Sequence, residues 1–341
     1  MRLFTSSSSD RVPHDPRGLS AVVAVILFLI GICGVEVFWR HLGHHPSVAD
    51  DPAWWAHHRA VASNLDTKTI ALLGTSRIQL GFSTEVFRDR YPEWKIAHLA
   101  VNGRRPIPAL LDLSEDEKFR GIVICDARAN TFDSSSGADQ QEYVDYFHRE
   151  FSASLNGQVN RVIGSHFQSM FVSINPWVRL GRVIKELIRH NALPEPNYLV
   201  TNFDRSRAAD YTLIDVAEHR QSRIDRVRQG IASRRRPKPE EWLDNLEKIK
   251  NAVSKIKSRG GDVVFVRFPT TGEHWQLDEQ AWPRRIYWDQ IGKHTGAHTV
   301  HFQDIAALAD LDCPDTSHID QRDKASFTSA LLDELVRLGT L

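Results

Sequence analysis

Five short apolar runs are the feature that most constrains the fold of this 341-residue chain. They occupy residues 70–73, 95–101, 121–125, 263–268 and 299–302, and a polar or glycine-containing turn follows each. Such runs are typical of parallel strands buried on both faces. Helical patterns lie between or after them, at residues 84–90, 107–113, 240–259 and 282–295 and in a closing helix with Phe327, Leu331, Leu335 and Leu338. We therefore predict a doubly wound, five-stranded parallel α/β sheet.

A serine follows the first of these runs. Residues 69–77 predict a buried strand that stops at Gly74 and presents Ser76 at the turn into the next element. Ligands of open parallel sheets bind at the carboxyl ends of the strands, so Ser76 is a candidate nucleophile. A helix N-cap is the simpler alternative for a serine in this turn.

An aspartate and a histidine, Asp315 and His318, precede the last helix. They follow the last strand as Ser76 follows the first, so all three can reach the same edge of the sheet. A serine, a histidine base and an orienting carboxylate are the parts of a nucleophilic triad. Taken singly, Asp315 could cap the helix and His318 could lie at the surface; their joint placement with Ser76 carries the hypothesis. Asp304, after the fifth strand, is a competing orienting acid.

The early Gly74-x-Ser76 and the late Asp315-x-x-His318 resemble the SGNH hydrolase superfamily, also called GDSL-like esterases, over residues 68–130 and 262–338. The resemblance implies a flavodoxin-like sheet of the SGNH type. Gly-x-Ser-Arg and Asp-x-Ser-His behind an apolar N-terminal segment are more narrowly similar to the membrane-anchored extracytoplasmic proteins of the DltD and alginate O-acetylation types. Thr75 stands where the superfamily has aspartate, as is common in that subgroup.

The resemblance also implies roles for these residues. Ser76 would attack an ester carbonyl, His318 would act as base and then as acid, and Asp315 would hold the imidazole tautomer. The oxyanion hole would comprise the backbone N–H groups of Ser76 and Gly103 and the side chain of Asn130, which comes a few residues later than the family's asparagine. Each such donor is typically worth ~3 kcal/mol.

Three further residues are candidates for substrate binding: Arg77, Asn102 and Arg267. Arg77 could bind an anionic substrate or pair with Asp126.

The predicted function is an envelope-located serine O-acyl esterase or acyltransferase acting on a cell-surface glycan or related polymer, with no cofactor and no metal. A catalytically silent, glycan-binding or scaffolding module of an acylation machinery is the alternative. The resemblance further implies a membrane acyl-transfer partner protein.

Residues 19–39 form an apolar segment long enough to cross a bilayer as a helix. We expect residues 1–18 to be a cytoplasmic tail, because Arg2, Arg11 and Arg17 favour an N-in orientation. No A-x-A-like cleavage site follows, so an uncleaved anchor is expected rather than a signal peptide. Residues 40–67 would form a juxtamembrane helix and linker, and residues 68–341 a periplasmic or otherwise extracytoplasmic SGNH-like domain of a single-pass inner-membrane protein.

The α/β alternation lapses at about residues 132–239, which we predict to be a largely helical insertion. Apolar residues recur at helical spacing over residues 163–188, and basic residues share the second half. This helix could lie on the bilayer surface, but we expect its apolar side to pack on the domain. The arginine-rich stretch at residues 205–236 predicts a solvated helix face or loop; an anionic partner is the alternative.

The charge balance, the cysteines and the histidines bear on nucleic-acid binding, disulfide bonds and metal sites. Acidic and basic residues balance at 43 each, which argues against nucleic-acid binding. Three cysteines are too few for a disulfide scaffold, and Cys125 and Cys313 are expected to be buried free thiols. The histidines between residues 41 and 58 have a spacing that fits no compact metal site.

Overall fold

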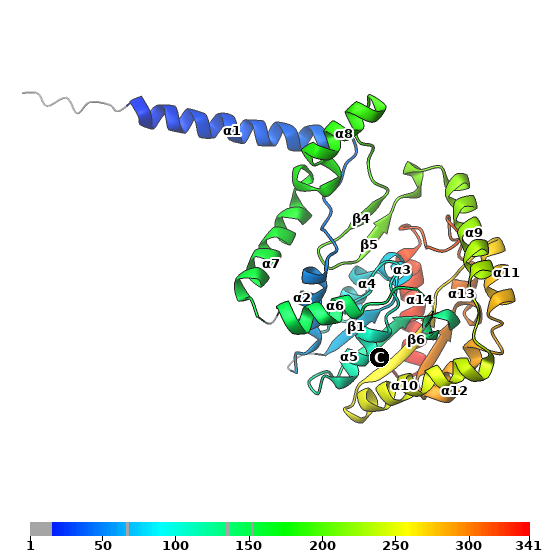
Figure 1. Cartoon of the computed structure of the whole chain (residues 1–341). Coiled ribbons are helices and arrows are strands. Elements are labelled where there is room, and N and C mark those ends of the chain that lie inside the picture. Colours follow the sequence, from blue (N-terminus) through cyan, green and yellow to red (C-terminus); the bar gives the residue numbers. More distant parts are fainter. Residues whose placement is uncertain (1–15, 66–67, 134, 136, 152) are drawn as a thin grey trace, which may run out of the picture.

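The structure is a computed structural model that describes residues 16–65, 68–133, 135, 137–151 and 153–341. Helix α1 (Pro16–His41) projects from an α/β domain, as Figure 1 shows. Residues 1–15 of the expected cytoplasmic tail lie outside the described residues.

The domain is built on a sheet of five parallel strands, as predicted. The strands are β1 (Thr69–Leu73), β2 (Lys95–His98), β3 (Ile122–Asp126), β6 (Asp262–Arg267) and β7 (His298–His301), and their order is β2-β1-β3-β6-β7. This is the flavodoxin-like order, which reverses direction between β1 and β3. A crevice forms at the carboxyl ends of the strands on either side of such a reversal.

Helices cover both faces of the sheet, so the sheet has a hydrophobic core on each side. One face carries α2 (Pro52–Ala62), α5 (Ile107–Glu115), α10 (Pro239–Ser258) and α12 (Trp288–Thr295). The other carries α3 (Ser76–Gly81), α4 (Thr84–Arg90), α13 (Ala306–Ala309) and α14 (Lys324–Arg337). Side chains of successive strand residues point to opposite faces. Cys125 of β3 lies in the first core, and Cys313, in the loop after α13, lies in the second; both are buried free thiols.

The apolar pattern located most of these helices. The five apolar residues of the predicted stripe on α10, Trp242, Leu246, Ile249, Val253 and Ile256, are all buried. The single helix predicted at residues 282–295 was wrong. The chain forms α11 (Gly272–Ala281) before it and then α12, which starts only at Trp288. In α11 only His274 and Ala281 are buried, so the sequence of this helix has no apolar stripe from which it could be predicted.

The segment between η1 (Ala129–Phe132) and α10 is largely helical. Its elements are α6 (Gln141–Tyr146), a π-helical turn η2 (Phe147–Phe151), α7 (Leu155–Met170), the short 3₁₀ turns η3 (Val172–Ile174) and η4 (Pro176–Val178), α8 (Leu180–His190), a hairpin of β4 (Leu199–Thr201) and β5 (Arg207–Ala209), a 3₁₀ turn η5 (Tyr211–Leu213), and α9 (Val216–Ser233). Helices α7 and α8 lie toward α1, and α9 lies on the other side of the domain, beside α11 (Figure 1).

The insertion holds the end of α1. The Glu36 carboxylate accepts hydrogen bonds from the backbone N–H groups of Val172 and Ser173, both at 2.9 Å. Arg40 donates to the carbonyl oxygen of Met170 at 2.6 Å, and Trp39 packs in a small apolar cluster with Val172. We call this set of contacts the α1 clamp. Residues 42–51 then run along the insertion, where the N–H of Val48 donates to the carbonyl of Thr201.

The apolar sides of α7 and α8 do not pack on the domain, contrary to our expectation. On α8 no residue is buried, and Leu180 and Ile188 are 74% and 80% exposed. On α7 the opposite side makes the domain contacts, where Arg161 binds Asp51 and the carbonyl of Ala49. The exposed apolar residues form what we call the α7–α8 face: Leu155, Val159, Ile163, Phe167, Met170, Leu180, Ile184, Leu187 and Ile188.

Candidate active site

The turn after β1 presents Ser76 at the start of α3. Gly74 in this turn has φ +139°, and a Cβ atom there would lie 2.6 Å from Cβ of Asp126, so only glycine fits. The Asp126 carboxylate accepts hydrogen bonds from the backbone N–H and the hydroxyl of Thr75, at 3.3 and 3.0 Å. Gln140 donates to the carbonyl oxygen of Gly74 at 3.1 Å. The turn is thus held from both β3 and the insertion.

The loop between α13 and α14 presents Asp315 and His318. One oxygen of the Asp315 carboxylate accepts the backbone N–H groups of Ser317 and His318, at 3.0 and 2.9 Å. The other oxygen lies 2.8 Å from Nδ1 of His318. This local turn fixes the carboxylate and the ring with respect to each other.

The two turns meet: Oγ of Ser76 lies 2.7 Å from Nε2 of His318. Because Asp315 accepts from Nδ1–H, the neutral imidazole has its lone pair on Nε2, where it can accept the Ser76 proton. Asp315 and His318 are buried, and Ser76 is half-buried. The arrangement has the chain of contacts that a serine nucleophile, a base and an orienting acid require.

Arg223 of α9 is a fourth member of this chain of contacts. It donates to the Asp315 carboxylate at 2.7 Å, on the same oxygen that faces His318. Burial raises the pKa of Asp315, but the hydrogen bond from His318 and the charge of Arg223 outweigh it, so the pKa lies well below its usual range. Burial lowers the pKa of His318 below 6.5, against the opposing effect of Asp315. Asp315 is therefore ionised and His318 neutral at pH 7.

A cavity of about 440 Å³ opens beside Ser76 and His318. Asn102, Gly103 and Asn130 also line it, at the ends of the strands on either side of β1. Gly103 has φ +71°, so its backbone conformation favours glycine. The three positions suggested for the oxyanion hole thus border a single space with the Ser76 hydroxyl.

Of the two arginines expected to bind substrate, Arg77 and Arg267, only Arg77 lines the cavity beside Ser76. Arg77 lines the cavity, and among the described residues it has no ion pair with Asp126. Arg267 lines a neighbouring hollow instead; it binds Asp278 at 2.6 Å and the carbonyl of Phe268 at 2.7 Å. Its guanidinium is therefore engaged within the protein. Asp304, the competing acid, forms an ion pair with Arg284 at 2.7 Å and so is engaged away from the imidazole.

Sequence reasoning missed the arginines of the insertion. Arg223, Arg226 and Arg234 line the cavity together with Arg105 and Arg128. The arginine-rich composition of residues 205–236 is the available signal; it predicts a solvated helix face or loop, with an anionic partner as the alternative. The structure shows that one side of α9 faces the cavity instead.

Comparisons with known proteins add little. No protein-family model matches the chain, and no curated protein matches its sequence. A solved structure described as "Crystal Structure of TesA" aligns with it at a TM-score of 0.37 and 10% sequence identity, over 80% of this chain and 99% of that chain. So distant a likeness carries no argument about activity. The function has to be argued from the site itself.

Proposed function

We propose that the protein is a serine O-acyl esterase or acyltransferase of the SGNH type. The observation that carries the proposal is the continuous contact from Ser76 Oγ to His318 Nε2, at 2.7 Å, and from His318 Nδ1 to Asp315, at 2.8 Å. The flavodoxin-like strand order and the positions of the serine, after β1, and of Asp315-x-x-His318, before α14, support the membership. Covalent labelling of Ser76 by a fluorophosphonate probe tests the proposal.

The geometry supports a double displacement. Oγ of Ser76 attacks the acyl carbonyl carbon while its proton passes to Nε2 of His318. The tetrahedral oxyanion accepts hydrogen bonds from the N–H groups of Ser76 and Gly103 and from the Asn130 amide. His318 returns the proton to the leaving oxygen, and an acyl-enzyme remains. Water or an acceptor hydroxyl then attacks that ester, with His318 again taking and returning a proton.

The pH dependence should show His318 as the base. We expect kcat/KM for an ester to fall as the pH drops through the pKa of His318, with a midpoint below 6.5. In Arg223→Gln the midpoint should move to higher pH, because a positive charge that disfavours the imidazolium is removed. The measurement is a pH profile of both proteins. A wild-type midpoint at or above 6.5, or one that Arg223→Gln leaves in place or lowers, would contradict this assignment.

We further propose that α1 anchors the enzyme in the cytoplasmic membrane, with its substrate a cell-surface glycan or related polymer outside the cytoplasm and a membrane acyl-transfer protein as partner. Gly18–His41 is long and apolar enough to span a bilayer, although a signal sequence meets the same criterion. The α1 clamp favours an uncleaved anchor, because cleavage beyond Trp39 would remove Glu36 from its two backbone partners. The exposed α7–α8 face, next to the end of α1, is suited to contact the lipid interface.

The expected topology can be measured with reporters fused after Leu341. A phosphatase that folds only after export should be active, and a reporter that works only in the cytoplasm should be silent. The intact mass of the membrane-extracted protein should include α1. The opposite reporter pattern would overturn the N-in orientation, and a mass lacking α1 would show a cleaved signal sequence.

A further inference from the structure

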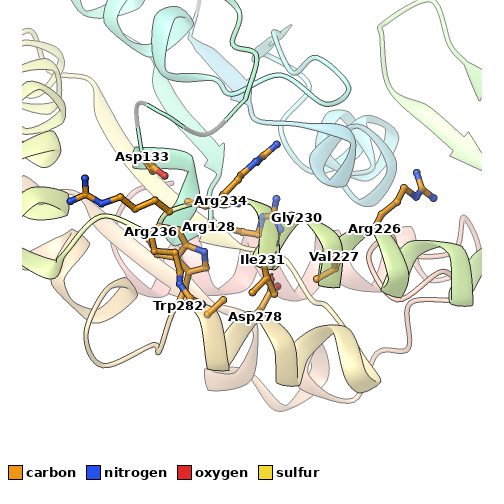
Figure 2. Close-up of a pocket in the computed structure, with 13 residues that line it drawn as sticks. Arg128, Asp133, Arg226, Val227, Gly230, Ile231, Arg234, Arg236, Asp278 and Trp282 are labelled. Atoms are coloured by element: carbon orange, nitrogen blue, oxygen red, sulfur yellow. Dashed lines mark ion pairs between the residues drawn. The ribbon is translucent and has the colours of Figure 1, made fainter.

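Six arginines line the cavity beside Ser76: Arg77, Arg105, Arg128, Arg223, Arg226 and Arg234. Four of its lining residues, Arg128, Asn130, Arg226 and Arg234, also line an adjoining hollow of about 230 Å³. Figure 2 shows this hollow, where Arg226 and Gly230 come from α9, Arg128 from the turn after β3, and Trp282 from the end of α11. The two spaces are therefore neighbours that share a basic wall.

The acidic groups nearby leave part of this positive charge unmatched. Among the described residues, the ion pairs of the cavity arginines are Arg105 with Asp139, Arg128 with Asp278, and Arg223 with Asp315. The Arg128 pair is long, at 3.9 Å, and Asp278 binds Arg267 more closely, at 2.6 Å. Within the same described part of the chain, Arg77, Arg226 and Arg234 form no ion pair; the Asp126 carboxylate also lines the cavity, and its charge acts on Arg77 from a greater distance.

Arg77 is the most informative of these side chains. It is only 6% exposed, and its buried Nε has no hydrogen-bond partner among the described residues. Burial, together with the charge of Arg128, lowers the pKa of Arg77 to about 10, so the group is still charged at neutral pH. A buried guanidinium N–H without an acceptor is costly, and an anion that enters the cavity would supply the missing acceptor.

We infer that this cavity binds an anionic group, a phosphate or a carboxylate, on the substrate whose ester bond Ser76 attacks. The inference rests on the proposed function and specifies the charge of its substrate. Guanidinium groups bind both anions through paired, charge-assisted hydrogen bonds. Arg77, Arg226 and Arg234 supply this recognition, while Arg223 is engaged with Asp315 and orients the triad. The carboxyl ends of β1 and β3, where the strand order reverses, place the anion next to the nucleophile.

The first test measures binding without catalysis. The full-length protein in detergent is titrated with inorganic phosphate and, separately, with D-glucuronate, at constant ionic strength set by chloride, and its thermal midpoint is followed. We expect a saturable rise with at least one anion. The Arg226→Gln, Arg234→Gln double variant should bind about tenfold more weakly. Arg228→Gln is the matched control on α9, because Arg228 pairs with Glu273 and should leave the affinity unchanged.

The two anions identify the source of the charge: tighter phosphate binding indicates a phosphorylated substrate, and tighter glucuronate binding an acidic sugar. No saturable rise with either anion, or equal binding by wild type and the double variant, would overturn the inference. Misfolding is checked by the midpoint of each variant without anion. If the double variant is unstable, Arg234→Gln alone serves in its place.

The second test links the anion to the reaction. The substrates are 4-nitrophenyl acetate and its ring-carboxylated analogue, 5-acetoxy-2-nitrobenzoate. We expect the ratio of kcat/KM for the anionic ester to that for the neutral ester to fall about tenfold in the double variant but not in Arg228→Gln. An unchanged ratio contradicts the inference. Anion binding without probe labelling at Ser76 would refute the proposed activity alone, and labelling without anion binding would refute this inference alone.

Discussion

Ser76→Ala should abolish covalent labelling by a fluorophosphonate probe and lower ester turnover by at least about a thousandfold. The expectation follows from the 2.7 Å contact between Ser76 Oγ and His318 Nε2, which provides both a nucleophile and an acceptor for its proton. Labelling is measured by mass spectrometry of the intact protein, followed by peptide mapping to the modified residue. Alanine removes only the hydroxyl, so the turn that Gly74 and Thr75 form should persist.

Ser258→Ala, at an exposed serine near the end of α10, is the matched control and should label as the wild type does. Labelling of wild type at a residue other than Ser76 would refute the nucleophile assignment. A folded wild type that resists the probe altogether would favour the alternative of a silent SGNH-like module that binds glycan or organises an acylation machinery.

Asp315→Asn should have the second large effect, a fall in kcat of roughly 10⁴, together with a loss of stability because the buried ion pair with Arg223 is removed. The asparagine oxygen can still accept the N–H groups of Ser317 and His318, so the loop is retained. The amide NH₂ would face Nδ1 of His318 and donate to it, so the imidazole would carry its proton on Nε2. In that tautomer Nε2 could not accept the proton of Ser76. Esterase kinetics and thermal unfolding of the variant are the measurements.

Asp304→Asn is the appropriate comparison, because that carboxylate pairs with Arg284 at the surface. It should leave kcat within about twofold, since exposed ion pairs contribute little. A larger fall in kcat with Asp304→Asn than with Asp315→Asn would reverse the assignment of the orienting acid.

The sequence predicted the sheet well because its signals are local. Each strand is a short apolar run, and residues such as Gly74 mark where a run must turn. Asp315 and His318 lie within one turn of each other, so their pairing was also accessible. Their meeting with Ser76 followed from the rule that parallel strands end at one edge of the sheet.

The misses have non-local causes. Arg223 reaches Asp315 across 92 positions of the chain, and no periodicity in α9 indicates this contact. Helix α11 lacks a buried stripe, so the pattern did not predict it, and the helix expected at residues 282–295 begins only at Trp288. The exposed apolar side of α8 was expected to be buried, since hydrophobic spacing shows that a face is apolar but not what covers it.

The α1 clamp would limit where the proposed enzyme can meet its substrate. A domain on a slack tether explores a wide volume above its anchor, but here Glu36 and Trp39 bind the insertion directly. The same insertion contains Arg223, which forms the ion pair with Asp315. If α1 spans a bilayer as proposed, Ser76 would be held at a set height above it and would move mainly by lateral diffusion and by rotation about α1. Polymer chains would be modified only in the layer that this height defines.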